Sequence, residues 1–398
     1  MNYPKIFFKK GFDKRLRKGS PWIFSNEIQI DSESKTIPIG SVVLLCSSAE
    51  QGSKPLVLGY FNPHSLICFR VLSFDIHEEI NIDFFEKKIR RALELREKFF
   101  DRPYYRLVHA ESDGLPGLII DRYNDIFSVQ LNTAGMDNQS NVITQTLQKV
   151  FHVKHLIFKN DSPFRSLDGL QIYTEESIGA LTNETIVIEN DIEFFCDLRD
   201  GQKTGWFYDQ RDNRKLVAQF AKGAKILDAY SYMGGFGINC AVAGATHVTC
   251  LDRSEKALEY ASKTAEKLKI DKDKISFVKE NVFDFFENYN NELFDIIILD
   301  PPAFIKSKKD IHVGTKGYLK LLKNALPFVK NGGFLFFASC SHHLTLELFY
   351  QTISESLLLS KKNGRILRVT GAGMDHPAHP HLPESQYLKG ALVEINDL

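Results

Sequence analysis

The sequence predicts an α/β protein whose C-terminal half is built on a parallel sheet. Residues 224–252 (AKILDAYSYMGGFGINCAVAGATHVTCLD) form the pattern of a buried strand, a glycine-containing loop, a helix and a second strand. Residues 294–304 (FDIIILDPPAF) contain four consecutive aliphatic residues, which is typical of a strand buried on both faces. The length of 398 residues predicts two or three domains rather than one.

Charge and cysteine content narrow the class of protein. The chain has 50 basic and 50 acidic residues, so a polyanion partner must be met by a local basic patch. The six cysteines form neither a C-x-x-C pair nor a cluster with histidines, which predicts reduced thiols, a cytoplasmic location and no metal site. The sequence has no signal-peptide pattern and no apolar run of membrane-spanning length, so we expect a soluble protein.

Residues 1–72 are predicted to form a small β barrel, because short strand-like runs alternate with turns and helical periodicity is missing. The first 20 residues hold seven Lys or Arg and one acid, Asp13. These basic residues could form an edge of the barrel that contacts the phosphates of a nucleic acid. The alternative is that they form a basic face exposed only to solvent. Residues 18–28 (KGSPWIFSNEI) resemble the opening of a PUA domain, an RNA-binding β barrel.

Residues 73–190 are predicted to form an α+β connector domain without catalytic spacing. Residues 118–131 predict a hairpin with a turn at residues 123–125. The other predicted elements are helices over 83–100 and 139–151 and strands over 155–159 and 185–188.

Residues 191–398 are predicted to be a Rossmann-like domain that binds a nucleoside. Asp228 follows the first strand of residues 224–252, and Asp252 ends the second. An acid at the second position commonly binds a ribose hydroxyl, while the glycine turn brings backbone N–H groups up to the ligand. The alternative is an ordinary parallel α/β domain, in which glycine turns and acids at strand ends are common.

The order of residues in the loop favours S-adenosylmethionine over NAD. The dinucleotide fingerprint needs glycines at the start of the loop, whereas here Tyr230, Ser231 and Tyr232 precede Gly234 and Gly235. S-adenosylmethionine has a ribose and an amino-acid end but no phosphate, so it suits two acids and a short aromatic and glycine loop.

Two further segments are predicted to lie near this ligand. Asn281 and Val282 follow the third strand (275–279) and are candidates for contacts with adenine. A polar and aromatic stretch before the first strand is a candidate lid, with a helix cap carrying surface charges as the alternative. Its candidate residues are Lys203, Tyr208, Gln210 and Arg211.

The end of the fourth strand predicts a site for a flat heterocycle. Asp300 is followed by Pro301 and Pro302, which cannot pair in a sheet and hold the chain extended. Ligands of open α/β sheets lie at this carboxyl edge. The Asp300 carboxylate can accept a hydrogen bond from an exocyclic amine, and the ring of Phe304 can stack. A plain loop cap is the alternative.

Cys340 is the candidate nucleophile. Most lone cysteines are buried and inert, but Cys340 lies in a polar turn (SCSHH) just beyond the fifth strand, at the edge that holds Asp300 if the strands are parallel. Nearby histidines and a helix start can lower the pKa of a thiol. A thiolate that adds to C6 of a pyrimidine makes C5 nucleophilic enough to accept a methyl group.

Taken in order, residues 200–214, 227–237, 299–304 and 339–343 resemble the bacterial large-subunit ribosomal RNA cytosine-C5 methyltransferases that carry an N-terminal PUA domain. Residues 379–395, with Tyr387 and Lys389, resemble the C-terminal strand pair of that family. The resemblance implies a class I methyltransferase fold and 23S ribosomal RNA as substrate.

The resemblance also implies roles for the residues already singled out. Residues 228–235, Asp252 and the loop at Asn281 would bind S-adenosylmethionine, Cys340 would be the nucleophile, and Asp300 would lie beside the target base. The residue that removes the C5 proton is unassigned, with His342 and His343 as candidates.

Three other functions are compatible with parts of this pattern. The first is methylation of a nitrogen of an RNA base, which needs no thiol because nitrogen supplies its own lone pair. The second is an NAD-dependent dehydrogenase, and the third is a non-catalytic RNA-binding protein with the same fold. The sequence leaves open a monomer or a homodimer.

Overall fold

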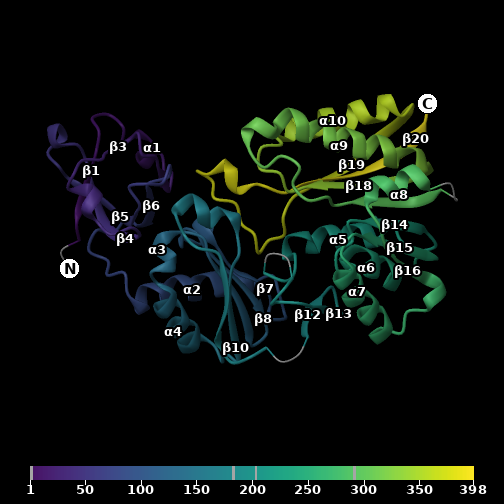
Figure 1. The fold of residues 1–398 in the computed structure, drawn as a ribbon, viewed down its shortest axis with the longest axis horizontal. Coiled ribbons are helices and arrows are strands. Elements are labelled where there is room, and N and C mark those ends of the chain that lie inside the picture. Colours follow the sequence, from purple (N-terminus) through teal and green to yellow (C-terminus); the bar gives the residue numbers. More distant parts are fainter. Residues whose placement is uncertain (1–2, 182–183, 202–203, 290–292) are drawn as a thin grey trace. The chain divides into compact units, whose positions relative to one another are not determined.

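The computed structural model describes residues 3–181, 184–201, 204–289 and 293–398 (Figure 1). The chain forms two compact units. Unit 1 comprises Met1–Thr185, Asp197–Trp206 and Met374–Ser385, and unit 2 comprises Ile186–Cys196, Phe207–Gly373 and Gln386–Leu398. Both units are therefore assembled from segments that are distant in the sequence.

The N-terminal part of unit 1 is a six-stranded sheet with the order β2-β6-β5-β4-β1-β3. Each strand-like run predicted in residues 1–72 contains a strand. Helix α1 (Lys14–Arg17) carries three of the basic residues of this region, Lys14, Arg15 and Arg17, around the buried Leu16. The strands are β1 (Lys5–Phe8), β2 (Trp22–Ile23), β3 (Ile28–Gln29), β4 (Ser41–Cys46), β5 (Pro55–Phe61) and β6 (Phe69–Ser73).

The remainder of unit 1 is a five-stranded sheet, β11-β10-β9-β8-β7, against which α2 packs. The predicted hairpin is confirmed, because Tyr123 pairs with Ile126 across a two-residue turn. The helix predicted over 83–100 runs from Ile82 to Arg96, and Phe100, which lies beyond its end, packs its ring against that of Tyr105. The elements are α2 (Ile82–Arg96), β7 (Tyr104–His109), β8 (Leu118–Tyr123), β9 (Ile126–Leu131), α3 (Ala134–Asp137), α4 (Ser140–Val150), β10 (His155–Asn160) and β11 (Tyr173–Ile178).

The segment Met374–Ser385 is held within unit 1 by buried polar contacts. The Asp375 carboxylate accepts a hydrogen bond from the backbone N–H of Arg106 at 3.0 Å, and its other oxygen lies 2.8 Å from Nδ1 of His376. Arg96 donates to the backbone carbonyl of Asp375 at 3.1 Å. These contacts explain why a segment from the C-terminal part of the sequence belongs to this unit.

Unit 2 is built on a seven-stranded sheet with the order β16-β15-β14-β17-β18-β20-β19. The first five strands are parallel, and β20 runs antiparallel to both neighbours. Residues 379–388, part of the stretch that resembled a strand pair, precede β20 rather than forming a strand. The strands are β14 (Lys225–Ala229), β15 (His247–Asp252), β16 (Ile275–Lys279), β17 (Phe294–Leu299), β18 (Val329–Ser339), β19 (Lys362–Thr370) and β20 (Lys389–Asp397).

Helices cover both faces of this sheet: α5, α6 and α7 lie on one face, and α8, α9 and α10 lie on the other (Figure 1). A short hairpin of β12 (Thr185–Glu189) and β13 (Ile192–Cys196) precedes them. The helices are α5 (Arg211–Ala218), α6 (Gly235–Val242), α7 (Glu255–Lys267), α8 (Val282–Asn288), α9 (Ile311–Ala325) and α10 (Leu346–Leu359).

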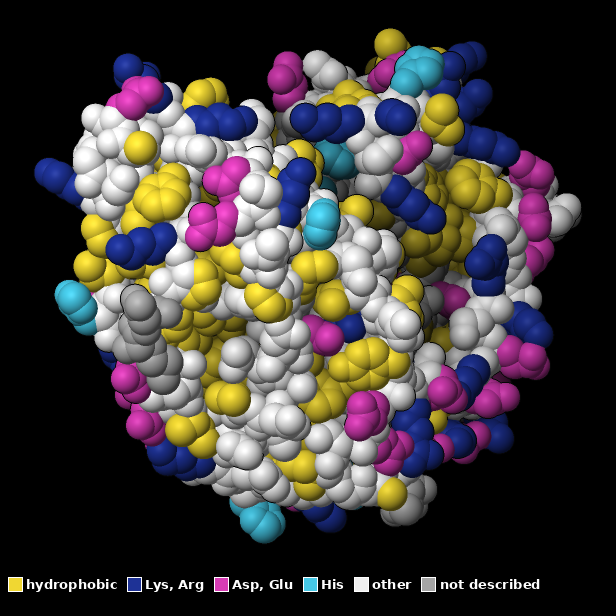
Figure 2. Space-filling view, turned by 60° about the vertical axis from the view of Figure 1, so that its left-hand side comes forward, with side chains coloured by type: hydrophobic (Ala, Val, Ile, Leu, Met, Phe, Trp, Pro, Cys, Tyr) yellow, Lys and Arg dark blue, Asp and Glu magenta, His cyan; other side chains and the backbone are white. Residues whose placement is uncertain are grey.

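The surface shows no continuous basic face in the view of Figure 2, where basic and acidic side chains lie interspersed among apolar ones. This agrees with the equal numbers of basic and acidic residues. Within the described residues, no helix is both long enough and apolar enough to span a bilayer.

Gly237 tests how closely α6 approaches the sheet. A Cβ at this position would lie 2.5 Å from Sγ of Cys250 and 3.1 Å from a carboxylate oxygen of Asp228. We predict that Gly237→Ala lowers the free energy of unfolding by about 1–3 kcal/mol, because buried atoms must shift to admit the methyl group. Denaturant unfolding measures this change.

Gly371→Ala is the matched control in the same unit, because the nearest atom to its added Cβ is a backbone oxygen at an ordinary 3.6 Å. We expect it to unfold close to the wild-type midpoint. Equal stability of both variants would contradict the close approach of α6 to β15.

Candidate active site

The parallel sheet brings the predicted site residues to one edge. Ala229 is level with Leu251 of β15 on one side and with Leu299 of β17 on the other, and Leu299 is level with Phe337 of β18. The carboxyl ends of these four strands therefore lie side by side. The residues at or just beyond the ends are Asp228, Tyr230, Asp252, Asp300 and Cys340.

The loop after β14 has an unusual backbone. Tyr230, Tyr232 and Gly234 have φ angles of 63°, 50° and 73°, in the left-handed region. Two non-glycine residues in this region cost on the order of 1–3 kcal/mol each, and such strain concentrates at ligand sites. Left-handed residues that alternate with other conformations turn successive backbone N–H groups toward one side, where they attract an anionic group.

Hydrogen bonds hold this loop in place. The backbone N–H of Ser231 donates to the carbonyl of Leu251 at 3.0 Å, and that of Gly234 donates to the carbonyl of Ser231 at 2.8 Å. The Asp252 carboxylate accepts from the N–H of Tyr232 at 2.9 Å and from that of Ser254 at 2.8 Å. Asp252 therefore both shapes the loop and presents an oriented carboxylate next to it.

Asp228 is a buried acid at this edge, and its pKa is raised. Its side chain is 1% exposed, and burial raises the pKa of its carboxyl to about 7, an effect to which the nearby Asp300 carboxylate adds. One carboxylate oxygen accepts from the N–H of Gly237 at 2.7 Å, which opposes the rise in pKa. Among the described residues, the other oxygen has no hydrogen-bond partner.

Ser231 provides a second buried polar atom of this kind. Its hydroxyl is buried and has no partner within the described part of the chain. Buried polar groups without partners are rare in folded proteins and often indicate a missing ligand or water. Gly235 lies beside Arg214, whose Nε would be 2.6 Å from a Cβ at position 235, so only glycine fits there without a shift.

Tyr318 of α9, which the sequence did not point to, links the loops that follow β17 and β18. Its buried hydroxyl lies 2.7 Å from the hydroxyl of Ser341 and accepts from that of Ser339 at 2.9 Å. It also accepts from the backbone N–H of Phe304 at 3.1 Å. Since Ser339 and Ser341 flank Cys340, the same phenol fixes the loop of Asp300 and the turn of Cys340.

The residues after Asp300 form a rigid rim. Pro301 is buried and Pro302 is exposed. The half-buried ring of Phe304 stacks on that of Tyr318, with centroids 4.6 Å apart. The backbone N–H of Asp300 lies 3.5 Å from the carbonyl of Ala229, so the acid stays close to β14.

Cys340 is half-buried, whereas the other five cysteines are buried. Lys389, the first residue of β20, is level with Ser339, and its ammonium donates to the carbonyl of Ser341 at 2.8 Å. A basic side chain therefore reaches across the turn that holds the thiol. His342 is exposed, and its ring lies 5.5 Å from that of Tyr387.

Asn281 and Val282 follow the third strand, as expected, and lie at the start of α8. The Asn281 side chain accepts from the N–H of Phe283 at 2.9 Å and caps the helix. The side chain of Val282 is buried in the core. Any contact of Val282 with a ligand would therefore be made by its backbone.

The stretch predicted as a lid belongs to unit 2 from Phe207 onward. Tyr208, Gln210 and Arg211 are buried, and Lys203 lies outside the described residues. The neighbouring Asp209 accepts a hydrogen bond from the hydroxyl of Tyr387 at 2.6 Å. These contacts tie the start of the domain to the segment that leads into β20.

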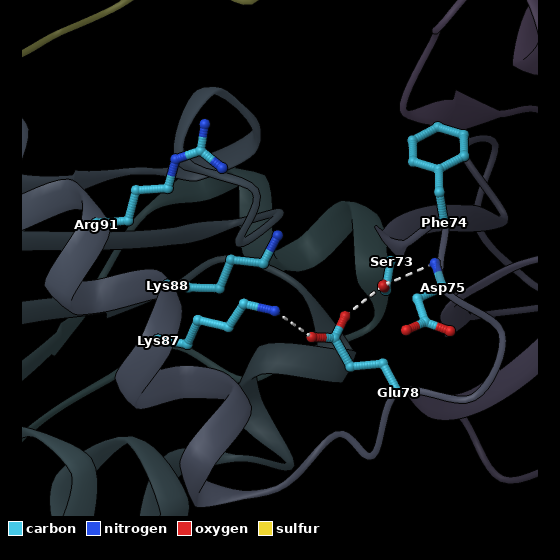
Figure 3. Close-up of a pocket in the computed structure, with 7 residues that line it drawn as sticks. All are labelled: Ser73, Phe74, Asp75, Glu78, Lys87, Lys88 and Arg91. Atoms are coloured by element: carbon cyan, nitrogen blue, oxygen red, sulfur yellow. Dashed lines mark hydrogen bonds and ion pairs between the residues drawn. The ribbon is translucent and has the colours of Figure 1, made fainter.

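A separate hollow of about 300 Å³ lies in unit 1, between β6 and α2 (Figure 3). Lys87, Lys88 and Arg91 of α2 line it together with Glu78, which accepts from Lys87 at 3.1 Å. Burial lowers the pKa of Lys88. This hollow contains none of the predicted site residues, so it is not the candidate active site.

Comparison with known proteins gives matches over nearly the whole chain. Residues 140–351 match the family model of S-adenosylmethionine-dependent methyltransferases, and residues 6–74 match that of PUA-like domains. A ribosomal RNA large subunit methyltransferase I from Aeromonas hydrophila is 35% identical over 396 residues, which cover 98% of each chain. The protein of the same name from Aliivibrio fischeri is 35% identical over 397 residues, covering 98% of this chain and 99% of that one.

Solved structures give the same fold. A protein assigned as a methyltransferase and crystallised with S-adenosylhomocysteine superposes with a TM-score of 0.83 at 22% identity, covering 99% of this chain and 100% of its own. The predicted α/β methyltransferase fold with an N-terminal PUA-like domain is confirmed.

The raised pKa of Asp228 makes the stability of the protein without ligand depend on pH. The folded state binds a proton on this carboxyl more tightly than the unfolded state does. The protonated carboxyl of Asp228 therefore contributes stability that is fully present below about pH 4 and is lost as the pH rises through about 7. We predict that Asp228→Asn melts at a higher temperature than wild type near pH 8. The difference should shrink as the pH falls towards about 5.

Thermal unfolding of both proteins across this pH range tests the prediction. Asp284→Asn is the control, because Asp284 is an exposed acid in the first turn of α8. If Asp228→Asn melts at or below the wild-type temperature at every pH, the Asp228 carboxylate does not carry the burial penalty described above.

Proposed function

The chain belongs to the S-adenosylmethionine-dependent ribosomal RNA large subunit methyltransferases with an N-terminal PUA-like domain, and on this premise we propose that it methylates carbon 5 of a cytosine in 23S ribosomal RNA. The proposed reaction passes through a covalent bond between Cys340 and C6 of the base. The observation that carries this proposal is the position of Cys340. Its half-buried thiol lies at the sheet edge that also holds Asp300 and the loop after β14.

The loop after β14 fits S-adenosylmethionine. The unpaired oxygen of Asp228 and the hydroxyl of Ser231 are buried polar atoms that a ligand can satisfy. The left-handed backbone at Tyr230 and Tyr232 suits the carboxylate of an amino-acid end. When bound, S-adenosylmethionine supplies an electrophilic methyl group on its sulfonium.

The remaining proposed contacts follow from position at the sheet edge. Asp252, whose carboxylate is already oriented by two N–H groups, would bind the ribose hydroxyls. Gly234 and Gly235 let the backbone approach the ligand. The side chain of Asn281 and the backbone of Val282 would meet the adenine.

In the proposed reaction, the Cys340 thiolate adds to C6 of the cytosine, and the electron pair of the C5–C6 double bond moves to C5. After C5 has gained the methyl group, a base removes the C5 proton. The electron pair then reforms the double bond, and the thiolate leaves C6. His342 and His343 lie in the same turn as Cys340, and we retain them as candidates for the base that removes the C5 proton.

Asp300 would hold the cytosine in this reaction. Its carboxylate accepts a hydrogen bond from the exocyclic amine, and the rim of Pro301, Pro302 and Phe304 packs against the ring. Tyr318 supports this role, because its hydroxyl fixes both the loop of Phe304 and the serines that flank Cys340. A base in paired RNA must be unstacked first, at a cost of about a few kcal/mol.

The division of the chain proposed from the sequence assigns RNA binding to residues 1–72, a connecting role to residues 73–190 and catalysis to residues 191–398. Exposed basic residues in α1 and just after it, including Lys14, Arg15 and Lys18, support contacts with RNA phosphates. Lys306, Lys308 and Lys309 add exposed positive charge beside the Asp300 loop.

Cys340→Ala tests the thiol. We predict that wild type converts cytidine in unmodified ribosomal RNA to 5-methylcytidine, and that the variant loses at least about a thousandfold in rate, because no other group forms the bond to C6. Methyl transfer from labelled S-adenosylmethionine, followed by mass spectrometry of the nucleosides, measures both. Binding of S-adenosylmethionine should survive in the variant.

Cys46→Ala is the matched control, because it removes a buried thiol from unit 1 and should retain wild-type activity. A methylated purine as product would favour the alternative function, methylation of a base nitrogen. Substantial 5-methylcytidine formation by Cys340→Ala would reject the covalent mechanism.

A further inference from the structure

Lys389 lies across the turn that holds Cys340. As the first residue of β20, it is level with Ser339, the residue before Cys340. Its ammonium donates to the carbonyl of Ser341, the residue after Cys340, at 2.8 Å. The side chain of Lys389 therefore reaches from one neighbour of Cys340 to the other.

This lysine is an unusual buried cation. It is 8% exposed, and in the described part of the chain no carboxylate pairs with it. Lysines are almost never this buried unless they have an anionic partner. Burial lowers the pKa of its ammonium to about 8, and the Cys340 sulfur opposes this shift.

Three groups that the structure describes near the thiol are less suited to balance a negative charge on it. Tyr318 from α9 is a phenol whose pKa is raised by burial, so it stays neutral. Asp300, at the end of the adjacent strand β17, is an acid and disfavours a second negative charge. His342, in the same turn, is exposed and lies against Tyr387.

We propose that Lys389 is a positioning residue whose ammonium stabilises the thiolate of Cys340. The inference rests on the proposed function, in which that thiolate is the nucleophile. The thiol releases its proton to water, and the charge that appears on Sγ balances the charge of the buried ammonium. The hydrogen bond to Ser341 holds the ammonium beside the turn before any RNA binds.

The rate at which iodoacetamide alkylates Cys340 tests this inference without RNA or S-adenosylmethionine. Only the thiolate reacts, so the pH profile of the rate reports the pKa of the thiol. Mass spectrometry of the peptide that contains Cys340 separates it from the five buried cysteines. In wild type we expect an apparent pKa below the ~8.5 of a free thiol.

Three variants separate charge from packing. Lys389→Met removes the charge at similar length and should raise the apparent pKa by about one unit or more, which makes alkylation near neutral pH about tenfold slower. Lys389→Arg keeps the charge and should keep most of the lowered pKa. Lys362→Met, a control at the other end of the same strand pair, removes a lysine that is paired with Asp397 and should leave the profile unchanged.

A wild-type pKa at or above that of a free thiol would overturn the inference even if no variant folds. The inference would also be overturned if the Lys389→Met variant keeps the wild-type melting temperature and shows the wild-type pH profile of Cys340 alkylation. The proposed function fails by a different result, which is 5-methylcytidine formation by Cys340→Ala. The two tests are therefore independent: the pKa of Cys340 can be low and depend on Lys389 whichever atom of the base is methylated.

Discussion

The parallel pairing of β17 with β14 on one side and β18 on the other is the constraint on which the candidate site depends. β17 is buried, and its register sets Leu299 level with Ala229 and Phe337. Because all three strands run in the same direction, the loops that follow them emerge at one edge. Asp228, Asp300 and Cys340 are spread over more than 100 residues of the sequence and thereby come to lie at one edge of the sheet.

Tyr318 adds a second constraint, because strand register fixes the strands but does not fix the loops that follow β17 and β18. One buried hydroxyl contacts the N–H of Phe304 and the hydroxyls of Ser339 and Ser341. The proposed site for the base and the proposed nucleophile thus have a common anchor. Pre-organisation of this kind matters for catalysis, because a shift of about 1 Å in a reacting group costs as much as a hundredfold in rate.

The positions that follow local rules were predictable from the sequence. Apolar runs identified the strands before Asp252, Asp300 and Cys340. The position of Gly234 and Gly235 near the end of their loop, rather than at its start, argued against an NAD site. The loop strain at Tyr230 and Tyr232 was not predictable, because neither residue favours a positive φ. The helix predicted to end at residue 100 ends at Arg96. The prediction was too long because Phe100 is apolar like the helix residues before it, although it packs against Tyr105 from outside the helix.

Contacts between distant segments lay beyond the reach of sequence patterns. Lys389 and Ser341 are 48 residues apart, and no local spacing relates them. Similarly, Met374–Ser385 belongs to unit 1 because Asp375 meets Arg96 and Arg106, which the order of the sequence does not reveal. The proposed roles of Tyr318 and Lys389 depend on such contacts, so they could be inferred only from the structure.

The most direct measurement of the central claim is covalent trapping with ribosomal RNA in which 5-fluorocytidine replaces cytidine. Fluorine at C5 cannot leave as a proton does, so a thiolate bound to C6 cannot be released after methyl transfer. The account predicts a denaturant-stable complex that needs S-adenosylmethionine, with the RNA attached to the peptide containing Cys340. If RNA is methylated but no such complex forms, or if the attachment lies elsewhere, the covalent role of Cys340 is contradicted.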